Sequence, residues 1–364
     1  MSARRLAAVI CANGLGHFRR SLEVLKALGR LEPALRIDVV CAQWQRKRMQ
    51  DWDVAKDLEG DSRVSWIHDL LEPGVTWSLD PAAYADGRLL SWVARLEASG
   101  VLEGADLVLS DNLPGVLALR KDAVLMGSFL WSDVLAEAYP DDAHVARFVA
   151  SERRLLAECR PPMLCVAAMA MPGVLDRTRA IPLPWMRAGA GRPDIRRPHP
   201  SGPRPKVAFL IGATGTSDPL AVAAAAALLD RGAEVALPRG LHEALRHRPG
   251  VSLFGFEAED FLGCDLALCR PGLGAVHDCI FYGLPMVLVH EEGNVELHHN
   301  GLRIEALRLC INLGHQLAPG EVAERLLAFA ASEAPGGIRE RMAETPLDGI
   351  DRAAAWLRGR LGAP

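Results

Sequence analysis

Apolar residues recur along the chain in two spacings that alternate with each other. Short continuous apolar runs, typical of strands buried on both faces, are followed by stretches with helical spacing, such as Phe18, Leu22, Leu25 and Leu28. The runs predicted as strands cover residues 6–11, 36–41, 64–67, 105–110, 123–131, 163–166, 207–211, 266–268 and 286–289, with short ones near Val235 and Val251. Strands that alternate with helices form parallel sheets, so the pattern predicts an α/β fold.

This alternation is interrupted between the two halves of the chain. Residues 187–206, RAGAGRPDIRRPHPSGPRPK, have a composition typical of an exposed connection. A chain of 364 residues is also long enough for two domains. The predicted parts are a first α/β domain at residues 1–185, a linker at 186–205, a second α/β domain at 206–345 and a C-terminal stretch at 346–364 with an amphipathic helix at 350–361.

Composition indicates which partners and which cellular compartment to expect. The formal net charge is −4, whereas general nucleic-acid binding needs a strong basic excess, so we expect no nucleic-acid partner. No apolar run reaches the length of a membrane span, and the apolar stretch at residues 6–12 is better interpreted as a first strand than as a signal peptide. The eight cysteines form no C-x-x-C pair, which favours free thiols in a cytoplasmic protein and no zinc site.

A short basic run, Gln-Arg-Lys-Arg, occupies residues 45–48. Such a run is typical of a solvated face. Peripheral contact with a membrane, or contact with an acidic acceptor, is the alternative that the sequence leaves open.

A glycine-rich loop, Asn-Gly-Leu-Gly-His, ends the first predicted strand and opens the first helix. Gly14 and Gly16 allow a tight turn against which a substrate can lie. Arg19 occupies the third glycine position of a G-x-G-x-x-G motif, so a dinucleotide cofactor is disfavoured. His17 stands at a helix N-terminus, which disfavours its protonation and suits a general base. A histidine that only caps the turn is the alternative.

A second loop follows the first strand of the second domain. It contains Gly212, Thr214, Gly215 and Thr216 and offers N–H and hydroxyl groups at a helix start. Such groups suit a phosphate, although a plain strand-to-helix turn is the alternative.

The richest chemistry lies in residues 269–309, which alternate strand, Gly-rich turn, helix, strand, acidic loop and helix. Gly272 and Gly274 let the backbone approach a ligand where the first of these helices begins, and a helix N-terminus suits an anion such as a phosphate. Asp278 stands one turn into the helix, placed to accept a hydrogen bond from a sugar hydroxyl. Gly283 is expected to end this helix in the left-handed conformation.

Residues 269–309 resemble the donor-binding segment of nucleotide-sugar glycosyltransferases of the GT-B fold, and are most similar to the N-acetylglucosaminyltransferases that form lipid II. The matching positions are Arg270, Gly272, Asp278, Gly283-Leu284-Pro285 and Asn300. Glu296 and Leu297 stand where that family has two glutamines, the first of which contacts the donor sugar. The resemblance implies two Rossmann-like domains that face each other across a cleft, with the last helix crossing back onto the N-terminal domain.

The resemblance also implies roles for single residues. Asp278 would bind the ribose of the nucleotide, and the backbone at Phe256 would contact the uracil edge, with a core aromatic as the alternative for Phe256. Arg270 and helix dipoles would stabilise the leaving diphosphate without a metal ion. A similarity to plant-type glycosyltransferases implies that Asp111, which follows a predicted strand, orients His17; a turn aspartate is the alternative.

These features predict a glycosyltransferase of the hexosyl or N-acetylhexosaminyl type. It would transfer a sugar from a nucleotide diphosphate sugar, which the resemblance implies is a UDP-sugar, to an acceptor that the sequence does not identify. The resemblance also implies inversion at the anomeric carbon. One alternative is a nucleotide-sugar hydrolase, because G-L-G-H-x-x-R-S, through Arg20 and Ser21, resembles hydrolases of pseudaminic acid synthesis. Another is a non-catalytic nucleotide-sugar-binding subunit. We expect no cofactor and no metal, since the adjacent His298 and His299 project in different directions.

Overall fold

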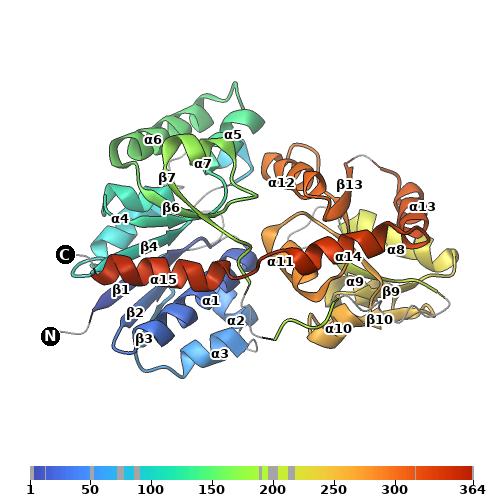
Figure 1. Ribbon diagram of the computed structural model, residues 1–364. Coiled ribbons are helices and arrows are strands. Elements are labelled where there is room, and N and C mark those ends of the chain that lie inside the picture. Colours follow the sequence, from blue (N-terminus) through green and yellow to red (C-terminus); the bar gives the residue numbers. More distant parts are fainter. Residues whose placement is uncertain are drawn as a thin grey trace. The chain divides into compact units, whose positions relative to one another are not determined.

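The computed structural model describes residues 4–12, 14–49, 53–71, 78–85, 91–187, 191–195, 204–211, 218–315 and 317–362. The chain forms two compact units: unit 1 contains Met1–Ala188 and Leu347–Pro364, and unit 2 contains Gly189–Pro346. Each unit has one parallel sheet with helices packed on it (Figure 1). The predicted α/β class with two parallel sheets is confirmed.

Unit 1 has, within the described residues, a seven-stranded sheet in the order β3-β2-β1-β4-β5-β6-β7. The strands are β1 (Arg5–Ile10), β2 (Arg36–Val40), β3 (Val64–Ile67), β4 (Leu107–Asp111), β5 (Val124–Met126), β6 (Pro162–Val166) and β7 (Arg179–Leu183). The central strands are apolar because helices cover the sheet, and every residue of β4 is buried. The strand order reverses between β1 and β4, which makes their carboxyl ends the topological switch point of this sheet.

The helices of unit 1 surround this sheet. They are α1 (Leu15–Leu31), α2 (Gln43–Met49), α3 (Asp53–Glu59), η1 (Pro81–Tyr84), α4 (Ser91–Ala98), η3 (Pro114–Ala118), α5 (Trp131–Ala138), α6 (Ala143–Cys159), α7 (Pro172–Arg177) and α15 (Gly349–Gly362). The apolar stripe predicted for the first helix is the buried face of α1. The C-terminal helix α15 packs along α1 (Figure 1), and Arg358 Nε donates to Glu32 Oε1 at 2.8 Å.

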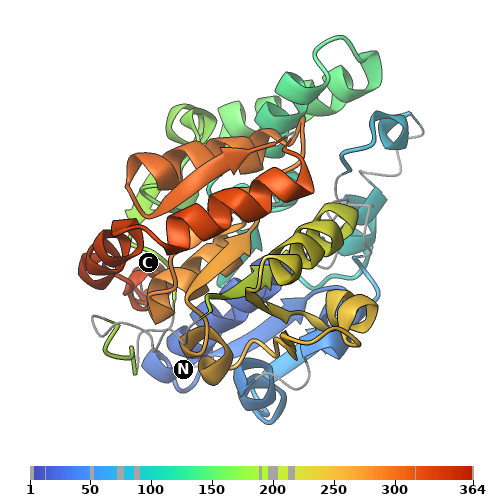
Figure 2. The same cartoon turned by 90° about the vertical axis from the view of Figure 1, so that its right-hand side faces the viewer.

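Unit 2 has, in its described part, a six-stranded sheet in the order β10-β9-β8-β11-β12-β13. Its strands are β8 (Lys206–Leu210), β9 (Glu234–Leu237), β10 (Val251–Leu253), β11 (Leu266–Cys269), β12 (Met286–Val289) and β13 (Cys310–Gly314). Its helices are α8 (Asp218–Asp230), α9 (Arg239–Leu245), α10 (Ala258–Leu262), α11 (Leu273–Tyr282), α12 (Val295–Ala306), α13 (Pro319–Ala330) and α14 (Ala334–Glu344). Helices α8 and α13 lie side by side (Figure 2), and the switch point falls between β8 and β11.

Two kinds of boundary differ from the sequence prediction. The apolar run at residues 123–131 is strand only in β5, because the buried residues after it form a connection and the start of α5, and continuous hydrophobicity does not separate these states. Strands β7 and β13 were not predicted. Both are edge strands with few buried residues, and β7 contains Pro182, so neither has the apolar run of a central strand.

The Arg/Pro/Gly-rich connection makes more contacts than its composition suggests. Met186 is buried and forms an isolated bridge with Asp348 inside unit 1. In unit 2, Arg192 Nη2 donates to the carbonyl oxygens of Ile280 and Met342. Ile195 is buried against the turn that ends α11. Met186 is therefore held by unit 1, and Arg192 and Ile195 are held by unit 2.

Gly283 ends α11 with φ 67°, in the left-handed region, and a Cβ there would lie 2.5 Å from Cβ of Ile195. Gly283→Ala is expected to lower the free energy of unfolding by about 1–2 kcal/mol for the backbone conformation, and by more because of the clash. Urea unfolding at constant m value measures this change.

Gly293→Ala is the matched control, since Gly293 has φ 75° but no heavy atom within 4 Å of its added Cβ. This variant should show only the backbone cost. Equal losses of stability in the two variants would mean that the contact with Ile195 does not constrain the turn.

Candidate active site

The carboxyl ends of β1 and β4 form the first candidate site, in unit 1. The two strands pair in parallel, and the register places Ile10 opposite Asp111. The connection after β1 and the end of β4 are therefore neighbours although they are about a hundred residues apart in sequence. This is the position at which ligands bind in open α/β sheets.

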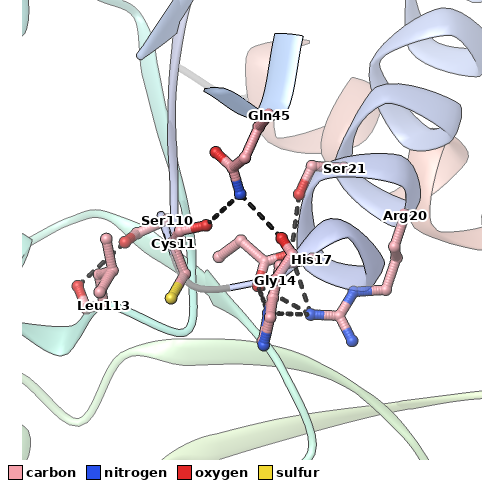
Figure 3. A network of polar contacts seen from close by, with 9 residues as sticks. Cys11, Gly14, His17, Arg20, Ser21, Gln45, Ser110 and Leu113 are labelled. Carbon is pink, nitrogen blue, oxygen red and sulfur yellow. Dashed lines mark hydrogen bonds and ion pairs between the residues drawn. The ribbon is translucent and has the colours of Figure 1, made fainter. Parts of the chain in front are cut away.

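The glycine loop after β1 is held by a buried glutamine. Gly14, the residue before α1, has φ 104°, a conformation that favours glycine. The Nε2 group of Gln45, which is fully buried, donates to the carbonyl oxygens of Cys11 at 2.8 Å and Gly14 at 2.9 Å (Figure 3). Gly16 lies in the first turn of α1. Gln45 thus fixes the loop that leads into His17.

His17 and Asp111 are in direct contact at this position. His17 Nδ1 lies 2.6 Å from Asp111 Oδ1, and their side chains are 18% and 1% exposed. A carboxylate only accepts hydrogen bonds, so the neutral imidazole carries its proton on Nδ1 and keeps its lone pair on Nε2. The arrangement gives His17 the tautomer that a general base needs.

Asp111 has two further donors. Arg20 Nη2 lies 2.8 Å from Oδ1 and 2.9 Å from Oδ2 of Asp111, and Ser21 Oγ donates to Oδ2 at 2.7 Å. Burial raises the pKa of the Asp111 carboxyl, but the charges of Arg20 and His17 and their hydrogen bonds outweigh burial and hold that pKa below its usual range. Asp111 is therefore ionised at neutral pH.

The switch point of the second sheet forms the other candidate site, in unit 2. The predicted phosphate loop with Gly212, Thr214, Gly215 and Thr216 follows β8 and lies outside the described residues. The turn after β11 is described: Gly272 precedes α11, and Gly274 lies in its first turn. No side chain of the described residues caps this helix, so its N-terminus suits a ligand with negative charge.

Arg270 and Asn300 hold the turn after β11 in different ways. Arg270 Nη2 donates to Glu291 Oε2 at 2.7 Å, and both side chains are about one-fifth exposed. Asn300 is buried, and its Nδ2 donates to the carbonyl oxygen of Pro271 at 3.0 Å. The Asn300 amide is therefore part of the turn itself, and the charge of Arg270 is already paired with a carboxylate.

Three other predicted donor residues lie elsewhere in unit 2. Asp278 is buried within α11, and Glu296 is half-buried in the first turn of α12. Phe256 is 46% exposed, has φ 67° and contacts the ring of Phe254 edge-on, with 5.0 Å between ring centroids. The alternative that Phe256 is a core aromatic is therefore wrong. The ligand contacts of Asp278, Glu296 and Phe256 stay predictions.

Histidines also gather after β12. The ring of His290 lies 5.4 Å from that of His298 and 5.5 Å from that of His315, measured between centroids. Burial lowers the pKa of His290, the backbone of Glu291 raises it through a hydrogen bond, and the neighbouring histidines lower it further. Among the described residues, no three His, Cys, Asp or Glu side chains are arranged to hold a metal ion.

Sequence reasoning gave no separate role to Arg20, Ser21, Gln45 or Glu291. The spacing of His17, Arg20 and Ser21 could have indicated the first two, because residues at i, i+3 and i+4 share one helix face. Nothing in the sequence near Gln45 indicates that its amide holds a loop from another strand.

No protein-family model matches the sequence, and no curated protein is significantly similar to it. Solved structures nevertheless share its fold along almost the whole chain. LpCGTa in complex with UDP has a TM-score of 0.70 and 14% identity, with 100% of both chains covered. Medicago truncatula UGT71G1 complexed with UDP-glucose has a TM-score of 0.69 and 11% identity, with 99% of this chain and 98% of that chain covered. CalG4, the calicheamicin glycosyltransferase, has a TM-score of 0.67 and 18% identity, with 100% of both chains covered.

At such identities the likeness establishes the fold. The protein has the GT-B fold of two Rossmann-like α/β units, as the sequence predicted. No helix in the described ranges is long and apolar enough to cross a membrane.

Asp111→Asn tests the electrostatics of the first site. The folded-state pKa of Asp111 lies below the unfolded value of about 3.9, so the carboxylate stabilises the fold above that pH, and the stabilisation is lost as the pH falls through the folded-state pKa. The variant leaves Arg20 without its buried counter-charge, so its free energy of unfolding should be about 3–5 kcal/mol lower than that of the wild type at pH 7. Urea unfolding between pH 7 and pH 3 should show that the difference in free energy of unfolding between wild type and variant becomes smaller below about pH 4.

Asp122→Asn is the control, because Arg120 lowers the pKa of Asp122 but the Asp122 side chain is 61% exposed. Its effect should stay within about 1 kcal/mol. If the difference in free energy of unfolding between wild type and Asp111→Asn does not change with pH, the assigned ionisation of Asp111 is contradicted.

Proposed function

We propose that this protein is a glycosyltransferase that transfers a sugar from a nucleotide diphosphate sugar, of the UDP type, to an acceptor hydroxyl with inversion. The observation that carries the proposal is the pairing of His17 with a buried, ionised Asp111 at the switch point of unit 1. A base that is oriented by a carboxylate is what removal of a hydroxyl proton requires.

The donor is assigned to unit 2. The turn at Gly272 and the start of α11 suit the diphosphate, because the N–H groups and dipole of a helix N-terminus stabilise negative charge. The solved structures that share the fold support a uridine nucleotide, since two of them were crystallised with UDP or UDP-glucose. The exposed ring of Phe256 follows β10 and is suited to contact a nucleobase.

The chemical step follows from these groups. Nε2 of His17 accepts the proton of the acceptor hydroxyl while the acceptor oxygen attacks the anomeric carbon of the donor. The bond between that carbon and the diphosphate oxygen breaks, and the nucleoside diphosphate leaves with the electron pair. Attack from the opposite side inverts the anomeric centre. Asp111 stabilises the imidazolium, and the α11 N-terminus stabilises the leaving diphosphate without a metal ion.

His17→Ala tests the base. Turnover should fall by about 10²–10⁴ while the variant stays folded and binds UDP with unchanged affinity. Release of nucleoside diphosphate from a panel of nucleotide sugars, with and without acceptor mixtures, measures turnover. His144→Ala, at a half-buried histidine in the first turn of α6, is the control and should keep full activity. Wild-type activity in His17→Ala would refute the proposal, and release without any acceptor would identify a hydrolase.

Asp278→Asn tests the donor side. Loss of a charge-assisted hydrogen bond to the ribose should weaken UDP binding by about 1.5–3 kcal/mol in calorimetry. The His17→Ala variant serves as the control, because a base in unit 1 should not contribute to nucleotide affinity. Unchanged affinity in a folded Asp278→Asn protein would remove Asp278 from the nucleotide site.

A further inference from the structure

The carboxylate of Asp111 is held from three sides by a single helix. His17, Arg20 and Ser21 stand at positions i, i+3 and i+4 of α1, so they share one face of the helix. Figure 3 shows their side chains converging, and all three contact Asp111, which comes from the neighbouring strand β4. A histidine oriented by an aspartate needs only the contact between His17 and Asp111, so the contacts from Arg20 and Ser21 call for a separate explanation.

The contacts are divided between the two oxygens of the carboxylate. Oδ1 lies 2.6 Å from His17 Nδ1 and 2.8 Å from Arg20 Nη2. Oδ2 lies 2.9 Å from the same Arg20 nitrogen and accepts from Ser21 Oγ at 2.7 Å. Because His17 contacts only Oδ1, Ser21 contacts only Oδ2 and Arg20 contacts both, rotation of the carboxylate would break several hydrogen bonds at once. Oδ1 therefore stays directed at His17.

Arg20 also changes the net charge of the cluster formed by His17, Arg20 and Asp111. Its side chain is 10% exposed, and its Nη2 lies 3.3 Å from His17 Nδ1 as well as in contact with Asp111. With His17 neutral, Arg20 and Asp111 cancel; when His17 takes up a proton, the three residues carry a net charge of +1. The positive charge of Arg20 thus offsets the negative charge of Asp111 next to the His17 ring.

We propose that Arg20 and Ser21 are positioning residues for the His17 base: Ser21 fixes the orientation of Asp111, and Arg20 offsets the negative charge of Asp111 next to the His17 ring. The proposal rests on the proposed function of His17 as a base. Asp111 from β4 and Arg20 from α1 both contact the His17 ring. On the next turn of α1, Glu23 is paired with Arg19 and Arg187, each at 3.2 Å.

The test compares the pH dependence of kcat/KM in Arg20→Gln, Arg20→Lys and Ser21→Ala. Arg20→Gln keeps a donor but removes the charge, so the acid limb of the profile should move to higher pH by about one unit. Arg20→Lys keeps the charge, and its acid limb should stay with the wild type. Ser21→Ala should lower kcat about tenfold with no shift of the limb, because it changes geometry and not charge. A purely structural role would give three variants of altered stability and identical pH profiles, which would overturn the proposal.

A second readout does not depend on sugar transfer. The titration of the His17 imidazole by NMR in the full chain should move in the same direction in Arg20→Gln and should not move in Arg20→Lys. If no nucleotide sugar is turned over, the proposed function fails, but this titration still decides whether Arg20 sets the protonation of His17. If Arg20→Gln does not fold, the neutral variant Arg20→Met takes its place: a titration shifted to higher pH would support the proposal, and an unshifted one would overturn it.

Discussion

The pairing of β1 with β4 is the constraint on which the first site depends. Their register sets Ile10 opposite Asp111, so the loop that enters α1 and the end of β4 meet at the point where the strand order reverses. Any other register would carry Asp111 away from the first turn of α1, since a shift of one residue turns a strand side chain to the opposite face. The apolar residues of β1 and β4, buried on both faces, hold this register and with it the contact between His17 and Asp111.

Placing an ionised carboxylate inside the protein has consequences for the residues around it. A buried charge is strongly unfavourable unless hydrogen bonds and an opposite charge compensate for it. Among the described residues, the contacts that compensate Asp111 come from α1, through His17, Arg20 and Ser21. The helix is fixed in turn by its apolar stripe against the sheet and by the loop that Gln45 holds. The contacts that stabilise the buried charge of Asp111 are therefore the same contacts that orient His17.

Much of the fold could be predicted because buried parallel strands are continuous apolar runs and the helices have clear periodicity. Edge strands such as β7 lack this signal, and the end of β5 is hidden in a longer apolar run. Site residues were harder to assign. The proximity of Asp111 to His17 was suggested by resemblance to other enzymes, because it depends on strand order and register. The pairing of Arg270 with Glu291 depends on two adjacent loops, and local sequence contains no signal for it.

The packing of α15 along α1 has a consequence for how the protein is made. The chain leaves unit 1 at Ala188, forms all of unit 2, and returns to unit 1 only at Leu347. In topological terms unit 2 is an insertion within unit 1. The helix that carries His17 lacks its partner helix until α15 has emerged from the ribosome. During synthesis, unit 2 can complete its core before unit 1 does, and His17 and Asp111 acquire their final surroundings only after α15 has packed on α1.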